Sequence, residues 1–175
     1  MTTALATLSV PGASSASGLA TGAPNSHVAS ASDKGPVVPG NNVTYWVEKN
    51  PPAPSKRALQ MAAEMEKLVS PMASGGGCKN TQGLGVCISW TDTQLKGDFY
   101  VNNWSGVVQY GTARLYINYK GTLVYKYTVV TDHLGAYPVA THGTSGSGSG
   151  YTLVDTFNQS GTSIGGGTSP YQYFP

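Results

Sequence analysis

Aspartate, histidine and serine side chains are the groups in this sequence that could support hydrolytic chemistry. Asp132 and His133 are adjacent, and Ser145 and Ser147 follow shortly after them. A Ser-His-Asp set is defined by geometry rather than by order in the chain, so these residues could form one. The serines lie in a Gly/Ser-rich stretch, whereas a nucleophile must be placed to within about 0.5 Å. We therefore expect these histidines to lie in solvated loops without a catalytic role.

Two other patterns could carry chemistry. Gly161 to Gly165 matches the G-x-S-x-G pattern, but that pattern needs a strand-to-helix turn and a later histidine, and neither follows Ser163. A zinc ion could use His133, His142 and Asp132, although this set lacks the compact spacing of known zinc sites. Neither pattern predicts a functional site.

Motifs for cofactors are missing. The sequence contains no phosphate loop, dinucleotide fingerprint or calcium loop, and we expect no cofactor and no metal. In residues 76–175 the carboxylates are Asp92, Asp98, Asp132 and Asp155, and no pattern places two of them across a cleft as glycoside hydrolysis requires. The sequence therefore predicts a protein without enzymatic activity.

The two cysteines, Cys78 and Cys87, lie in a Gly-rich stretch. Their even number and close spacing suit a local disulfide that clamps the first strand to the segment before it. Two free thiols are the alternative. A metal site would need two more ligands at suitable spacing, and these are missing.

The clearest structural pattern spans residues 112–130, where apolar and polar residues alternate on both sides of a Lys-Gly pair. A period of two predicts β-strands. Gly121 can take the positive φ of a tight turn, so the two halves should pair antiparallel. Because an isolated hairpin is marginal in water, residues 75–175 should add strands to make a small antiparallel β-sandwich. The additional strands are expected to begin at Leu84, Gly97, Ser105 and Tyr151. The Gly-rich stretches after His142 and Ser160 are expected to be flexible.

One amphipathic helix is predicted from Ser55, which can cap it, to about Val69, where Ser70-Pro71 stops it. Its apolar face packs either on its own domain or into a groove of a partner. That face consists of Ala58, Met61, Ala62, Met65, Leu68 and Val69.

The N-terminal part divides into two segments. Residues 1–42 contain hardly any large apolar side chain and are predicted to form a disordered, low-complexity arm. Residues 43–74 combine an extended segment with the predicted helix. In the extended segment, Val43, Tyr45, Trp46 and Val47 either anchor a partner protein or form a strand on their own domain.

Charge and composition exclude several classes of protein. Only 10% of the residues are charged and the net charge is +2, so no basic surface for nucleic acid is expected. Low charge with many Ser, Thr, Asn and Gly residues favours a secreted protein. No apolar run is long enough to span a membrane. The N-terminus lacks the basic start of a complete signal peptide, so it is either truncated or mature, or export uses another route.

The remaining feature is an uncharged, aromatic C-terminal half. Tyr-rich strands and Trp104 could stack on sugar rings, because an aromatic side chain offers an apolar face. This favours a carbohydrate-binding module as the alternative function. The competing interpretation is that these rings fill the core of a small sandwich.

The Ala/Ser/Gly arm, the cysteine pair in GGGCKNTQGLGVCISW and the short Tyr-rich strands resemble small secreted actinobacterial β-sandwich proteins. Among these, the chain resembles the adaptor subunits of umbrella toxin particles. The resemblance implies a non-enzymatic connector, in which an extended N-terminal segment engages a large toxin subunit and the sandwich presents a lectin-like subunit. On this resemblance, residues 43–48 are the candidate docking strand.

Overall fold

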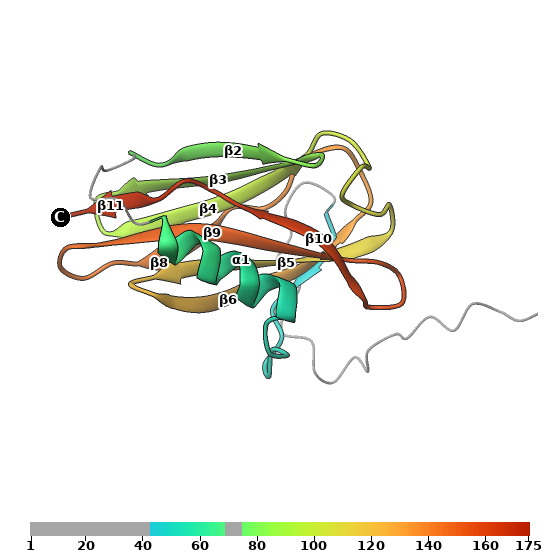
Figure 1. Cartoon of the computed structure of the whole chain (residues 1–175), viewed down its shortest axis with the longest axis horizontal. Coiled ribbons are helices and arrows are strands. Elements are labelled where there is room, and N and C mark those ends of the chain that lie inside the picture. Colours follow the sequence, from blue (N-terminus) through green and yellow to red (C-terminus); the bar gives the residue numbers. More distant parts are fainter. Residues whose placement is uncertain (1–42, 69–74) are drawn as a thin grey trace, which may run out of the picture.

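The computed structural model describes residues 43–68 and 75–175. The arm predicted over residues 1–42 and the helix stop at Ser70-Pro71 lie outside the described residues. Within the described ranges, eleven strands form two antiparallel sheets and one helix lies against them (Figure 1). The predicted fold, mainly β with an antiparallel sandwich and one helix, is confirmed. No helix in the described ranges is both long and apolar enough to cross a membrane.

The larger sheet has the strand order β1-β6-β5-β9-β10, and β11 pairs with β9 next to Gly148–Gly150. The smaller sheet has the order β2-β3-β4-β7, and β8 also pairs with β4. The strands of the larger sheet are β1 (Tyr45–Trp46), β5 (Gly111–Tyr119), β6 (Thr122–Thr131), β9 (Gly148–Phe157), β10 (Ser163–Thr168) and β11 (Gln172–Phe174). Those of the smaller sheet are β2 (Gly77–Thr81), β3 (Leu84–Thr91), β4 (Gln94–Val101), β7 (Gly135–Ala136) and β8 (Ala140–Gly143).

The hairpin of β5 and β6 is the predicted one. Tyr119 pairs with Thr122, which leaves a two-residue turn of Lys120 (φ 51°) and Gly121 (φ 84°). Two successive positive φ values match the right-handed twist of paired strands. The side chain of Asn118 accepts a hydrogen bond from the Gly121 amide at 3.1 Å, which fixes the turn.

The main hydrophobic core lies between the two sheets. Its side chains come from alternate positions of each strand, as the period of two requires. Burying each large apolar side chain contributes roughly 1.5–3 kcal/mol to stability, so this layer holds the sheets together. The fully buried members include Leu84, Val86, Ile88, Leu95, Phe99, Val101, Leu115 and Ile117.

Helix α1 (Lys56–Lys67) confirms the predicted helix, and its hydroxyl cap is Ser55, which accepts from the Ala58 amide at 3.1 Å. Figure 1 shows α1 lying over the larger sheet. Its buried side chains pack on the outer face of that sheet, so the helix docks on its own domain. The contacting residues are Ala58, Ala62 and Met65 from α1 and Tyr116, Tyr151 and Leu153 from the sheet. Leu68, placed on the apolar face by the sequence, is 66% exposed.

The smaller sheet packs on one face of the larger sheet, and α1 packs on the other. Residues 150–157 of β9 are all buried, because one side faces the smaller sheet and the other faces α1. This explains why the strand sequence from Tyr151 lacks a clear alternation of apolar and polar residues.

Three expectations about local structure are wrong. The segment from Ser105 is a loop rather than a strand. Its Val107 side chain is buried in the core, and the Thr131 hydroxyl donates a hydrogen bond to the Val108 carbonyl at 2.7 Å. The Gly-rich stretches expected to be flexible contribute instead to β8, β9, β10 and β11. Their glycines allow close packing: a Cβ on Gly150 would lie 2.4 Å from the Asn118 carbonyl oxygen.

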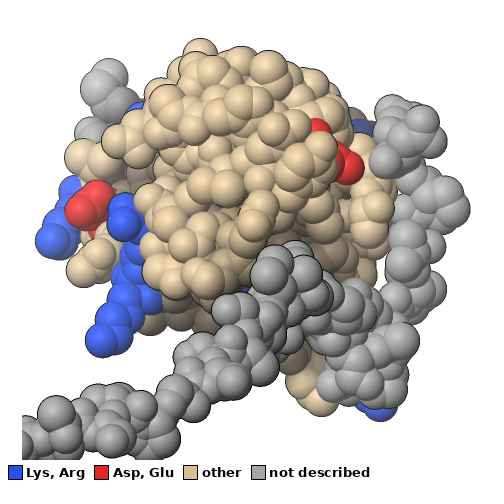
Figure 2. Space-filling view, turned by 90° about the vertical axis from the view of Figure 1, so that its right-hand side faces the viewer, with Lys and Arg blue, Asp and Glu red and all other residues tan. Residues whose placement is uncertain are grey.

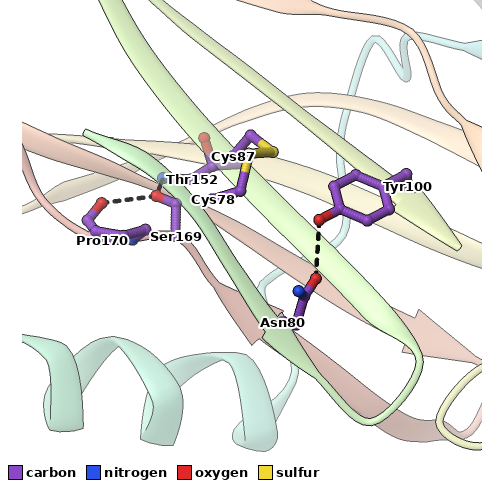
Figure 3. The surroundings of a disulfide bond; sticks show 7 residues. All are labelled: Cys78, Asn80, Cys87, Tyr100, Thr152, Ser169 and Pro170. Carbon is purple, nitrogen blue, oxygen red and sulfur yellow. Dashed lines mark hydrogen bonds between the residues drawn. A yellow bond between two sulfur atoms is a disulfide. The ribbon is translucent and has the colours of Figure 1, made fainter. Parts of the chain in front are cut away.

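The predicted disulfide is present between Cys78 and Cys87, with an S–S distance of 2.04 Å. The two residues face each other in the register of β2 and β3, as Figure 3 shows. Strand β2 lies at the edge of the smaller sheet, and four of its five residues are exposed. The disulfide therefore ties a weakly packed edge strand to a buried one.

A buried carboxyl group lies beneath the start of α1. The Asp155 side chain is fully buried, and its Oδ1 accepts a 2.7 Å hydrogen bond from the Ser163 hydroxyl. Its Oδ2 has no hydrogen-bond partner among the described residues. Burial raises the pKa of Asp155, because the charged form is desolvated.

This raised pKa predicts a pH effect on stability. The folded state holds the proton more tightly than the unfolded state, so the contribution of Asp155 is lost as pH rises above about 4. The Asp155→Asn variant keeps an acceptor for Ser163 but cannot ionise. Its stability relative to the wild type should therefore be greater at pH 7 than at pH 4, as measured by urea unfolding at both values. An equal difference at the two pH values would contradict this account.

Candidate functional site

The structure separates the groups that could have formed a hydrolytic set. His133 Nδ1 lies 2.7 Å from Asp132 Oδ1, just beyond the end of β6 that pairs with Gly111 at the start of β5. Ser145 lies near the other end of β5, where its amide donates to the Tyr119 hydroxyl at 3.0 Å. The aspartate–histidine pair and the serine therefore lie at opposite ends of the sandwich and do not form a triad.

The other chemical candidates are also divided. Ser163 lies in a strand, and its hydroxyl bonds to Asp155 under α1, so it lacks the exposed turn of a hydrolase nucleophile. His142 packs on Tyr119 and lies 3.1 Å from Lys126 Nζ. Burial, together with the charge of Lys126, lowers the pKa of His142. In the described part of the chain, no three His, Cys, Asp or Glu side chains are grouped closely enough to hold a metal ion.

The predicted docking segment pairs with its own sheet. Tyr45 and Trp46 form β1 opposite Val129 and Thr128 of β6. Val43 is only 7% exposed and belongs to the core between the sheets. The Tyr45 ring is partly buried against that core, whereas Val47 is 41% exposed. In this structure the segment forms an edge strand, in which Trp46 is partly exposed and Val47 is the most exposed apolar side chain.

Trp104, the predicted sugar-stacking residue, lies in the loop between β4 and β5. Its ring is partly buried and packs against the core between the sheets. Because the ring is only partly buried, part of its surface remains exposed. The structure therefore gives Trp104 a partly structural position.

Four connecting segments gather at one end of the sandwich, which we call the loop end. They are residues 82–83, 102–110, 132–134 and 158–162, and they form the right-hand end of the molecule in Figure 1. Backbone hydrogen bonds join neighbouring segments. The Asn102 amide donates to the Gly83 carbonyl at 2.7 Å, and the Tyr110 amide donates to the Thr131 carbonyl at 2.7 Å.

The loop end is almost uncharged, and three apolar side chains are exposed among its neutral polar residues. Val108, Tyr110 and Leu134 expose 37%, 62% and 51% of their surfaces. Among the four described segments, Asp132 is the only Asp, Glu, Lys or Arg, and it is paired with His133. Figure 2, which looks onto this end, shows a central surface that is mostly neither acidic nor basic, with Lys and Arg side chains gathered at its left edge.

Tyr110 has an unusual backbone conformation. Its φ is 61°, in the left-handed region that non-glycine residues seldom adopt. Such a conformation costs on the order of 1 kcal/mol. The conformation is held by the bond to Thr131 and by the Gly111 amide, which donates to the Val108 carbonyl at 3.0 Å. A strained residue with an exposed ring is a reason to expect a role in binding.

Sequence reasoning missed these three residues. The alternation around Val108 and Tyr110 suggested a strand, which would have buried one side of the segment. Leu134 directly follows Asp132 and His133, and no pattern in the sequence distinguishes it from a core leucine. Low charge gave no signal, because residues 158–162 and other loops of this weakly charged chain are uncharged as well.

The comparisons with known proteins place the chain in no family. No family model, curated protein or solved structure matches it.

Proposed function

We propose that this protein is a non-enzymatic, secreted adaptor that binds a partner protein through the loop end of its sandwich. The observation that carries the proposal is the group of exposed apolar side chains around the strained Tyr110. The centres of protein interfaces are depleted in charge and enriched in aromatic residues, and Tyr is common among the residues that dominate binding energy. The low charge of the loop end and its exposed Tyr110 fit this description.

The class of partner follows from the resemblance to adaptor subunits of umbrella toxin particles. On that basis, the partners are a large toxin subunit and a lectin-like subunit. The disulfide supports an oxidising, extracellular location, because such bonds persist mainly outside the cytosol. The low charge of the whole chain supports the same location.

The N-terminal segment has a smaller role in this proposal than the sequence indicated. While β1 pairs with β6, Val43 is buried and Tyr45 is partly buried, whereas Val47 is exposed. Removing residues 1–42 leaves β1 in place and so tests the arm separately from the sheet. An effect of this deletion on partner binding would assign the arm a role in docking.

Tyr110 provides the main test. A photo-crosslinking residue at position 110 should capture one defined secreted protein of the source organism, whereas the same residue at position 59 should not. Leu59 is a matched control because it is 52% exposed on α1, outside the loop end. Equal capture from both positions would reject the loop end as the binding site.

The Tyr110→Gly variant should separate binding from stability. Glycine adopts positive φ without strain, so the variant should be as stable as the wild type or more stable by up to about 1 kcal/mol. The crosslink formed from a second loop-end position, Leu134, should weaken at least about tenfold, because an interface aromatic typically contributes more than 1 kcal/mol. Urea unfolding and quantitative crosslinking measure the two effects. Retained crosslinking in a stable variant would contradict the proposal.

A carbohydrate-binding module is the alternative function. The packing of Trp104 against the core leaves only part of its ring for the platform expected from the sequence. This alternative needs a different aromatic residue with a free face.

A further inference from the structure

On the outer face of the smaller sheet, a row of small residues runs along one strand, a feature that the sequence did not reveal. The outward positions of its central strand β3 hold only small residues, Gly85, Cys87 and Ser89. Across the register, the neighbouring strand β4 carries the longer side chains of Tyr100, Asp98 and Lys96. On this face, a row of small residues on β3 therefore lies beside a row of longer side chains on β4.

The Tyr100 ring lies flat across this row of small residues. A Cβ added to Gly85 would be only 1.9 Å from Cζ of the ring, so the ring rests directly on the backbone of β3. The Tyr100 hydroxyl donates to Asn80 Oδ1 on β2 at 2.8 Å (Figure 3). The side chain thus spans from β4 across β3 to β2. Because one face of the ring rests on the sheet, the opposite face points away from the protein.

Polar groups lie beside this ring. Asp98 is two residues before Tyr100 on the same strand and pairs with Cys87 of the disulfide, so it occupies the next row of the same face. Lys96 follows in the row after that, opposite Ser89. The Asn80 side-chain amide lies at the hydroxyl end of the Tyr100 ring, where it accepts the Tyr100 hydrogen bond. One carboxylate and one ammonium group give this face no net charge.

This combination selects a class of ligand. A sugar ring has an apolar C–H face that can stack on an aromatic ring, and its hydroxyls can bond with a carboxylate and an amide. An anionic ligand would meet the Asp98 carboxylate, and a purely apolar ligand would leave the polar groups of the face without partners. The chemistry of the face is therefore complementary to a neutral, polyhydroxylated molecule.

We propose that the outer face of the smaller sheet binds a neutral sugar ring, which stacks on Tyr100 and forms hydrogen bonds with Asp98 and Asn80. This sugar site lies on a sheet face, whereas the proposed protein-binding site lies on the connecting segments of the loop end. The two proposals can therefore be tested and rejected independently. A purely structural role is the alternative: an aromatic ring can pack over a glycine in a sheet, and Tyr100 would then lie there only to cover Gly85. The experiments below distinguish the two roles.

The first experiment is an amide-shift NMR titration of the full chain with four neutral trisaccharides: cellotriose, chitotriose, maltotriose and mannotriose. At least one should shift the amide signals of Gly85, Asp98 and Tyr100 in a saturable way at millimolar concentration. The Tyr100→Ala variant should weaken that binding at least about tenfold. Leu59→Ala is the control, because it removes an exposed side chain from α1, which packs on the larger sheet, and it should leave the titration unchanged.

A second set of variants excludes an effect of folding. Tyr100→Leu keeps an apolar cover on Gly85 but removes the aromatic face, so it should stay folded and lose sugar binding. Asp98→Asn and Asn80→Ala should each weaken binding severalfold while leaving the fold intact. The proposal is overturned if none of the four trisaccharides shifts these amides, or if Tyr100→Leu binds as well as the wild type. In either case Tyr100 serves only to cover Gly85.

Discussion

Replacing Leu115 with alanine is expected to lower the free energy of unfolding by about 3 kcal/mol, within the range of 2–5 measured for buried leucines. Leu115 is fully buried in β5, between Tyr127 of β6 and Val154 of β9. Removing three carbon atoms there loses transfer free energy and leaves a cavity. The paired strands on both sides restrict the collapse that would fill it.

Leu134 offers a matched control for this effect. It is 51% exposed at the loop end, so Leu134→Ala should change stability by no more than about 0.5 kcal/mol. Guanidinium unfolding of both variants gives the two values under the same conditions. A loss below about 1 kcal/mol for Leu115→Ala would mean that the core between the sheets is less tightly packed than the structure indicates.

The second large effect concerns the disulfide. Replacing both Cys78 and Cys87 with serine should lower the free energy of unfolding by about 2–3 kcal/mol, because the bond closes a loop of about ten residues in the unfolded chain. The two cysteines are nine residues apart in sequence. The edge strand β2 should lose order first, since most of its residues are exposed.

Reducing agent provides the control for this prediction. Dithiothreitol should lower the stability of the wild type by a similar amount and leave the double serine variant unchanged. Titration of thiols in denatured, unreduced protein should find none. Two reactive thiols in that titration would show that the disulfide does not form in solution.

The sequence was informative wherever a local pattern determined the structure. The β5–β6 hairpin was predictable because its alternation and its Lys-Gly turn both act within a few residues. Helix α1 was predictable because Ser55 caps it and its apolar residues recur with helical spacing. The packing of α1 on the sheet could not be predicted, because an apolar face fits its own domain or a partner equally well.

Strands rich in glycine could not be recognised from their own sequence. β10 contains Gly165, Gly166 and Gly167, which have no side chains to show an alternation. Their role depends on distant residues: a Cβ on Gly165 would lie 2.4 Å from the Gly106 carbonyl oxygen. Such a close approach exists only in the folded protein.

The candidate sites depend on the same kind of distant contact. The backbone of Tyr110 is held by Thr131, which lies at the distant end of β6. The orientation of the Tyr100 ring depends on Gly85 and Asn80, which the register of β2, β3 and β4 brings beside it. A single sequence shows the tyrosines but not these neighbours, so it identified the aromatic character of the surface without its location.

The position of β9 in the larger sheet has a consequence for the rate of folding. β9 lies between β5 and the pair β10 and β11, and its pairing with β5 joins Thr112 to Phe157. The pairing of β1 with β6 joins Tyr45 to the still more distant Val129. Contacts between residues so far apart require long loops to close before they stabilise the chain, and proteins dominated by them fold in milliseconds to seconds. The local hairpins β2–β3, β3–β4, β5–β6 and β9–β10 should therefore form first, and the long-range pairing of β5 with β9 and of β1 with β6 should limit the rate at which the sandwich closes.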